Sequence, residues 1–99
     1  MNLPVALYTT TIGPTGQQVS DGWLSAGTEI QDIDATIGGS DITVTITITI
    51  GGGLAPEQVR MTPAELATFA GHVAFEDSAA ADYLQHQAEQ AAEEMGWQA

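Results

Sequence analysis

An uninterrupted alternation of apolar and hydroxyl side chains over residues 42–50 constrains the fold of this chain more than any other feature. The run reads Ile-Thr-Val-Thr-Ile-Thr-Ile-Thr-Ile. Because successive side chains on a β-strand point to opposite faces, one face is entirely Ile and Val and the other entirely Thr. Every position is β-branched, which favours a strand, and its length is about 30 Å. An uncharged strand of this kind would promote aggregation at a sheet edge, so we expect it in the interior of a small sheet.

Shorter alternating segments are predicted to supply the other strands. Four segments carry this pattern between turn signals: residues 3–12, 17–20, 28–37 and 57–61. Pro4 favours an edge position for the first of them. Asp21 and Gly22 predict a turn that ends the second. The third is expected to form a hairpin with the strand over 42–50.

A capping signal at residues 62–65 predicts the start of a first helix. Thr62 can accept a hydrogen bond at the cap, Pro63 suits the first helical position, and Glu65 can reach back to the amide of the cap. The apolar stripe that follows consists of Leu66, Phe69, Ala70 and Val73. We expect this stripe to lie on the Ile/Val face of the sheet.

A second helix is predicted over residues 78–95, after an acidic break that a helix dipole favours. Its apolar stripe is thin and mostly alanine, with Tyr83 at its flank: Leu84, Ala88, Ala91 and Met95. A face this thin predicts either close packing on its own domain or contact with another chain. Gly96 is expected to end the helix, which leaves Trp97 just outside it.

These signals together predict a single α+β domain over residues 1–99, mainly β over 1–61 and helical over 62–96. The sheet is antiparallel with three to five strands. The first helix crosses its Ile/Val face, and the second lies at the C-terminus. Among the large side chains, Trp23, Leu24 and Phe75 are expected in the core.

The charge of the chain is strongly one-sided. Thirteen Asp and Glu residues stand against Arg60 alone, which gives a net charge of −12. The proportion of acidic residues is ordinary, but the basic residues that usually balance them are almost absent. We interpret this deficit as a surface that repels polyanions and attracts cationic partners, with a halophilic source or simple solubility as the alternative explanations.

This charge also excludes several functions. Direct binding of nucleic acid or of an anionic membrane needs several Lys or Arg side chains. The sequence contains no membrane span, and residues 1–14 lack the pattern of a signal peptide. It contains no Cys, which fits a reducing compartment. We therefore expect a cytoplasmic protein, in the host cytoplasm if a phage encodes it, that binds neither nucleic acid nor membrane directly.

The spacing of four residues on the second helix raises the question of a metal site. Asp82, His86, Glu89 and Glu93 share one face, and imidazole with carboxylates can bind a divalent ion. A solvated acidic face with a helix-stabilising pair between Asp82 and His86 is the simpler interpretation. We predict no metal and no cofactor here.

A second candidate begins like a calcium loop but does not continue as one. Asp32, Asp34 and Thr36 have the alternate-oxygen spacing, yet Ile37 stands where the loop needs glycine and Thr43 where it needs glutamate. No spacing of Ser, His or carboxylates points to catalysis elsewhere. We therefore predict that the protein is not an enzyme.

Residues 76–94 concentrate acidic residues without a single Lys or Arg. Six of them form the predicted partner-binding surface: Glu76, Asp77, Asp82, Glu89, Glu93 and Glu94. In length, acidity and lack of an enzymatic motif, the chain resembles the small inhibitors that phages deploy against host nucleases, anti-CRISPR proteins among them. That resemblance implies an inhibitor that engages the basic, nucleic-acid-binding surface of a target protein or nucleoprotein complex, as a coarse nucleic-acid mimic.

A different class of function fits the same sequence. A non-enzymatic assembly or adaptor protein, such as a virion or toxin-system component, could self-associate through the alanine stripe or an open strand edge. The homodimer is the simplest form of this alternative. Both hypotheses predict a preference for cationic partners, so acidity alone does not separate them.

Overall fold

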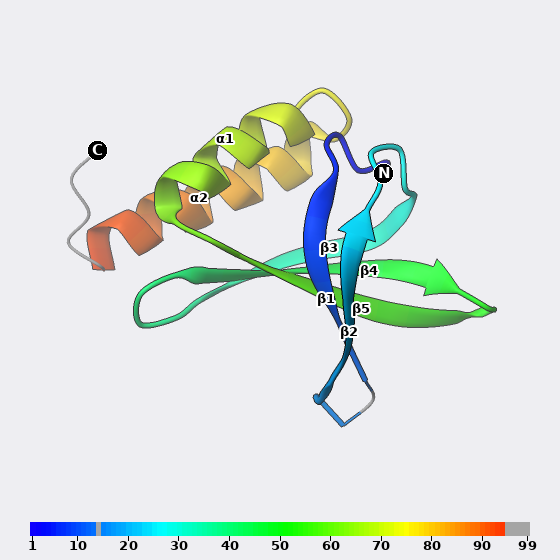
Figure 1. Cartoon of the computed structure of the whole chain (residues 1–99). Coiled ribbons are helices and arrows are strands. Elements are labelled where there is room, and N and C mark those ends of the chain that lie inside the picture. Colours follow the sequence, from blue (N-terminus) through cyan, green and yellow to red (C-terminus); the bar gives the residue numbers. More distant parts are fainter. Residues whose placement is uncertain (14, 95–99) are drawn as a thin grey trace.

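The computed structural model describes residues 1–13 and 15–94. A five-stranded antiparallel sheet is followed by two helices (Figure 1), so the α+β prediction is confirmed. The elements are β1 (Leu7–Ile12), β2 (Gln18–Leu24), β3 (Ile30–Ile37), β4 (Ile42–Ile50), β5 (Gly53–Met61), α1 (Pro63–Val73) and α2 (Ser78–Glu94). Within the described residues, neither helix is long and apolar enough to cross a membrane.

The strands lie in the order β2-β1-β5-β4-β3. The uncharged strand β4 therefore lies between two neighbours, and its predicted interior position is confirmed. The predicted edge position of the first strand is wrong, because β1 lies between β2 and β5. Pro4 does not interrupt the sheet there, since β1 begins only at Leu7.

The strand β2 is longer than predicted, and the turn predicted at Asp21 and Gly22 is wrong. Both residues pair with β1, opposite Thr10 and Thr9 respectively. The Asp21 carboxylate accepts hydrogen bonds from the Thr10 hydroxyl at 2.7 Å and from the Gln18 amide at 2.9 Å. One of these bonds joins β1 to β2 and the other lies within β2. The Asp21 carboxylate is therefore not available for the hydrogen bond that would stabilise a local turn.

The strand β5 also begins earlier than predicted. It pairs with β4 over the full length of that strand, from Ile42 opposite Met61 to Ile50 opposite Gly53. Gly51 and Gly52 make the connection with φ angles of 57° and 83°, in the left-handed region that suits glycine. A tight turn of this kind brings β5 into register with β4 at once.

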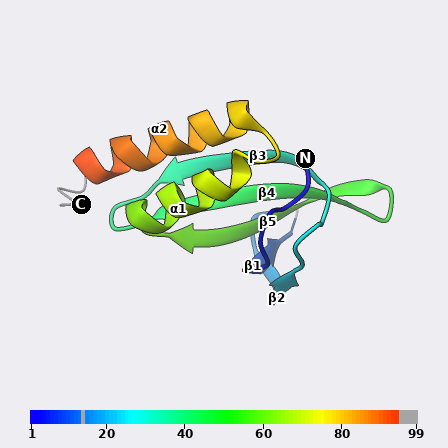
Figure 2. The ribbon, with the colours of Figure 1, turned by 90° about the horizontal axis from the view of Figure 1, so that it is seen from above.

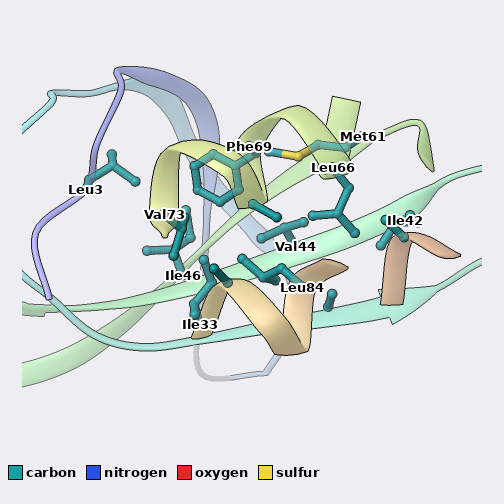
Figure 3. Close-up of a cluster of buried hydrophobic side chains, with 14 of the residues drawn as sticks. Leu3, Ile33, Ile42, Val44, Ile46, Met61, Leu66, Phe69, Val73 and Leu84 are labelled. Atoms are coloured by element: carbon teal, nitrogen blue, oxygen red, sulfur yellow. The ribbon is translucent and has the colours of Figure 1, made fainter. Parts of the chain in front are cut away.

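Both helices cover the Ile/Val face of the sheet. α1 lies over β4 and β5, and α2 lies along β3 (Figure 2). Figure 3 shows Leu66, Phe69 and Val73 of α1 beside Val44 and Ile46 of β4, all of them buried. The predicted stripe on α1 and its predicted position are therefore confirmed. Burial of each such side chain contributes about 1.5–3 kcal/mol.

The predicted capping box starts α1. The amide of Glu65 donates to the Thr62 hydroxyl at 3.2 Å, and the Glu65 carboxylate accepts from the Thr62 amide at 2.9 Å. At the start of α2, Asp77 accepts from the amide of Ala80 at 3.1 Å and acts as its cap. Both helices thus begin where a side chain satisfies an otherwise free amide.

The thin stripe of α2 packs within the domain. Leu84, Ala88 and Ala91 are buried in the same core as α1 and the sheet. Alanine allows close approach of the two helices, so the stripe is used inside this chain and is not left for another one. The predicted stripe residue Met95, the cap Gly96 and Trp97 lie outside the described residues.

Two aromatic residues that were predicted in the core lie at the surface. Leu24 is buried, but Trp23 is 71% exposed because strand alternation directs it to the opposite face of the sheet. Phe75 is 89% exposed, because α1 has already ended at Val73 and the chain is turning toward α2. These two corrections leave large aromatic side chains available at the surface.

Candidate partner-binding surface

Three of the six acidic residues predicted for partner binding lie on one exposed face of α2. Asp82, Glu89 and Glu93 are all exposed. At 3.6 residues per turn they fall within about 40° of one another around the helix axis, over a length of about 16 Å. We call these three residues the α2 acidic row.

The other three predicted residues do not join this row. Glu76 is exposed in the connection before α2, and Glu94 is exposed about a quarter-turn away from Glu93. Asp77 is half-buried, and one of its oxygens caps α2. Three of the six residues thus form the row, and the other three lie outside it. Asp77 also caps α2.

His86 lies on the same exposed face as the α2 acidic row. An imidazole four residues after Asp82 is placed for the helix-stabilising pair that the spacing predicts. Across residues 1–13 and 15–94, no group of three or more His, Asp or Glu side chains is arranged to hold a metal ion.

The residues that resemble the start of a calcium loop are part of a strand. Asp32, Asp34 and Thr36 belong to β3 and pair with β4, so they cannot wrap around an ion as a loop does. Asp34 instead accepts a hydrogen bond from the Tyr83 hydroxyl. The same hydroxyl accepts from the amide of Ala35 at 3.2 Å.

Tyr83 therefore joins α2 to the outer edge of the sheet. β3 is an edge strand, and its outward amide at Ala35 would otherwise be a free donor. Partial burial raises the pKa of Tyr83, and its hydrogen bond to the carboxylate of Asp34 raises it further. The phenol thus stays protonated as a donor, and it occupies the outward amide of Ala35 on this edge strand.

A separate cleft lies between the start of α2 and β3. Asp32 and Asp77 line this cleft together with the ring of Tyr83, and its volume is about 290 Å³. Carboxylates and an aromatic ring both attract positive charge, and the amino group of Met1, which also lines the cleft, donates to the Ile30 carbonyl there at 3.3 Å. The cleft brings Asp32 and Asp77 together from distant parts of the sequence.

A second surface was not predicted. Tyr8 and Trp23 are paired across β1 and β2, and their rings meet edge to face with centroids 5.6 Å apart. Arg60 lies on the same open side of the sheet, because its chain neighbours Val59 and Met61 belong to the core side. Strand alternation around Trp23 could have signalled its exposure, but only the strand order brings Arg60 near the aromatic pair.

Comparison of the chain with protein-family models, with curated proteins and with solved structures gave no match. Two surfaces of different chemistry remain for a functional argument. One is the acidic surface of α2 and the cleft beside it. The other is the open face of the sheet, with its aromatic pair and Arg60.

Proposed function

We propose that this protein is a non-enzymatic inhibitor that binds the basic, nucleic-acid-binding surface of a target protein or nucleoprotein complex, such as a nuclease or a defence effector. The observation that carries the proposal is the α2 acidic row, in which three carboxylates are exposed on one helix face. A protein with a net charge of −12 and one Arg attracts cationic surfaces at long range. Such attraction speeds the encounter with a basic partner and disfavours acidic ones.

The spacing of the carboxylates in the α2 acidic row favours binding to a basic protein surface. Three carboxylates over about 16 Å give one charge per roughly 5 to 8 Å of helix, whereas duplex DNA carries one per about 1.7 Å of its axis. The row alone is therefore a coarse imitation of a phosphate backbone. It matches Lys and Arg side chains that are spread over a basic surface.

The alternative, self-association through the alanine stripe of α2, is less well supported. Ala81, Ala88 and Ala91 are buried in the core of their own chain. On β3, one of the two outer strands, the Tyr83 hydroxyl occupies the amide of Ala35. A partner of opposite charge thus accounts for the exposed side of α2 better than a second copy does.

The test is affinity capture of basic nucleic-acid-binding proteins from a cell lysate, with purified tagged protein at about 50 mM salt. Captured proteins should elute as salt rises toward 500 mM, because screening shortens the reach of exposed charges. Added duplex DNA or RNA should displace them, since the proposal places both on one basic surface. A purified captured protein then gives a dissociation constant and its salt dependence.

Two matched double variants locate the interface. D82N/E89Q removes two charges from the α2 acidic row, and we expect about three- to tenfold weaker binding. E29Q/D41N removes one Glu and one Asp elsewhere, so it makes the same change in net charge and should bind almost as the unmodified protein does. Equal weakening by both variants would reduce the proposal to net charge alone, and capture that resists high salt would contradict it.

A further inference from the structure

The chain contains a single Asp-Gly sequence, at Asp21 and Gly22, and it lies in the exposed strand β2. In such a pair the backbone nitrogen of the glycine can attack the side-chain carboxyl carbon of the aspartate, because glycine has no side chain to hinder the approach. The attack forms a C–N bond, releases the amide hydrogen with the carboxyl OH as one water molecule, and closes a five-membered succinimide ring. Addition of water to either carbonyl of the ring then restores aspartate or yields isoaspartate, in which the chain runs through the side-chain carboxyl. This pair therefore has a covalent chemistry of its own that needs no enzyme and no cofactor.

Neither the backbone conformation nor the available space requires glycine at position 22. The φ angle of Gly22 lies outside the left-handed region, whereas Gly51 and Gly52 lie inside it. A Cβ atom added at Gly22 would meet no heavy atom within 4 Å. Gly22 pairs with Thr9 in the regular register of β1 and β2. An alanine would therefore fit here, so the reactivity of the pair can be removed without disturbing the fold.

The native strand holds Asp21 away from the reactive geometry. On a strand the side chain stands roughly perpendicular to the sheet, whereas the amide of the next residue lies in the hydrogen-bonding plane of the sheet. The Asp21 carboxylate is also held by the Thr10 hydroxyl at 2.7 Å and by the Gln18 amide at 2.9 Å. Ring closure thus requires the carboxylate to leave both donors and the backbone to leave its strand conformation.

The position of β2 allows it to open locally. It is an outer strand of the sheet, with β1 as its neighbour. Six of its seven residues are exposed, and Leu24 at its end is the buried one. Figure 1 shows the hairpin of β1 and β2 extending away from the helices. A segment with few buried apolar contacts opens at a lower free energy than the whole protein unfolds, so Asp21 can reach the reactive geometry while the core stays folded.

We infer that Asp21 and Gly22 form a site of spontaneous aspartate isomerisation, and that the pairing of β2 with β1 sets its rate. The Thr10 hydroxyl couples the two, because it holds the reacting carboxylate from the neighbouring strand. Isoaspartate puts one extra atom into the backbone of β2, which disrupts the ladder much as an inserted residue does. Trp23 then loses its position opposite Tyr8, where the two rings meet edge to face with centroids 5.6 Å apart. This inference goes beyond the proposed function, because it concerns the reactivity of β2 and not the acidic face of α2.

The test compares the rate of isoaspartate formation at position 21 in the full chain, folded and in concentrated urea, near neutral pH. Peptide mapping with electron-transfer fragmentation distinguishes isoaspartate from aspartate, which has the same mass. We expect the folded chain to react at least about tenfold more slowly than the unfolded chain. T10V should accelerate the reaction of the folded chain about two- to tenfold, because it removes one hydrogen bond to the carboxylate. T11V is the matched control, since this side chain points to the other face of the sheet, and it should react as the unmodified protein does.

A second variant separates the chemistry of the pair from the strand that holds it. G22A should form little isoaspartate in either the folded or the unfolded chain, because its Cβ hinders the attack on Asp21. In the purified isomerised protein, the amides of β2 should exchange faster with solvent than in the unmodified protein, and unchanged exchange would contradict the disruption of the ladder.

The inference is overturned if the unfolded chain forms no isoaspartate at position 21, or if G22A forms as much as the unmodified protein. It is equally overturned if the folded and unfolded chains react at the same rate, or if T10V reacts no faster than T11V. Far-UV circular dichroism establishes that each variant is folded. Gln18→Ala removes the other donor to the carboxylate and supplies the result if T10V is not folded.

Discussion

The hydroxyl of Thr9 donates a hydrogen bond to Oε1 of Glu57, with 3.0 Å between the two oxygens. Both side chains lie inside the protein, only 2% and 7% exposed. Oε2 of Glu57 has no hydrogen-bond partner among the described residues. A buried carboxylate with so little support is costly, because burial removes its hydration without full replacement. The Thr9 hydroxyl is the group that offsets part of this cost.

Replacement of Thr9 by Val removes this donor and keeps the shape of the side chain. We expect the free energy of unfolding to fall by about 1.5–3 kcal/mol, the range for a hydrogen bond to a charged group. Urea unfolding followed by circular dichroism measures the change. Thr11→Val on the same strand is the control and should cost less than about 0.5 kcal/mol. Equal costs for T9V and T11V would show that the bond to Glu57 is unimportant.

The Tyr83 hydroxyl connects α2 to Asp34 and Ala35 of the edge strand, and its loss should be measurable in two ways. Tyr83→Phe leaves the ring packed but removes the donor to Asp34 and frees the amide of Ala35. We expect a loss of about 1–2 kcal/mol in unfolding free energy near neutral pH. Hydrogen exchange at the Ala35 amide should accelerate, because its side-chain acceptor is gone. Unchanged exchange at that amide would contradict its occupation by the Tyr83 hydroxyl.

The same residue predicts a pH dependence at the alkaline end. The pKa of Tyr83 is raised from its ordinary value of 10.0 in the folded protein, by burial first and by the bond to Asp34 second. The stabilising effect is therefore complete below pH 10 and is lost as pH rises through the raised pKa of the folded state. Unfolding free energy should fall with pH in that window, and Y83F should fall less steeply. Parallel slopes for the two proteins would exclude this linkage.

The elements predicted correctly are those whose signals lie close together in the sequence. The alternation of β4 and the capping box of Thr62 and Glu65 depend on residues at most a few positions apart. The acidic row of Asp82, Glu89 and Glu93 was predicted in the same way, because helical spacing alone places the three on one face. In each case a single local periodicity determines the geometry.

The wrong predictions concern positions whose structure is determined by contacts between residues distant in the sequence. Pairing with β1 carries β2 through Asp21 and Gly22, although the two residues have strong turn preferences. Trp23 is exposed because the core lies on the other side of its strand, where its neighbour Leu24 is buried. The proximity of Tyr8 to Arg60 depends on β1 lying beside β5, and the pairing of Thr9 with Glu57 joins residues 48 positions apart. Neither the proximity of Tyr8 to Arg60 nor the bond between Thr9 and Glu57 could be predicted from the sequence pattern.

The capping box allows the effect of one hydrogen bond to be distinguished from the helix propensity of threonine. Thr62→Ala removes the hydroxyl that accepts from the Glu65 amide, and we expect a loss of about 1 kcal/mol. Thr68→Ala is the matched control on the exposed side of α1. Its hydroxyl donates to the Ala64 carbonyl within the helix, and alanine is the better helix former, so T68A should be neutral or slightly stabilising. Thermal unfolding compares the two, and a larger loss in T68A would contradict this view of the cap.

The last prediction concerns how α2 is held on the sheet. Leu84 is the largest fully buried side chain that α2 contributes, whereas Leu54 on β5 is 68% exposed. Leu84→Ala should lower the unfolding free energy by about 2–5 kcal/mol, because the neighbouring alanines are too small to fill the cavity. Leu54→Ala makes the same chemical change and should cost less than about 0.5 kcal/mol.

The comparison also tests whether α2 is part of the cooperative fold. If α2 were only loosely attached, L84A would resemble L54A in urea unfolding, and the α2 acidic row would not be held as one surface. If the helix is docked as the burial of Leu84, Ala88 and Ala91 indicates, L84A should unfold at clearly lower urea with one transition. In that case α2 stays docked in folded L84A, so binding of a basic partner through the α2 acidic row should be unchanged in the absence of urea.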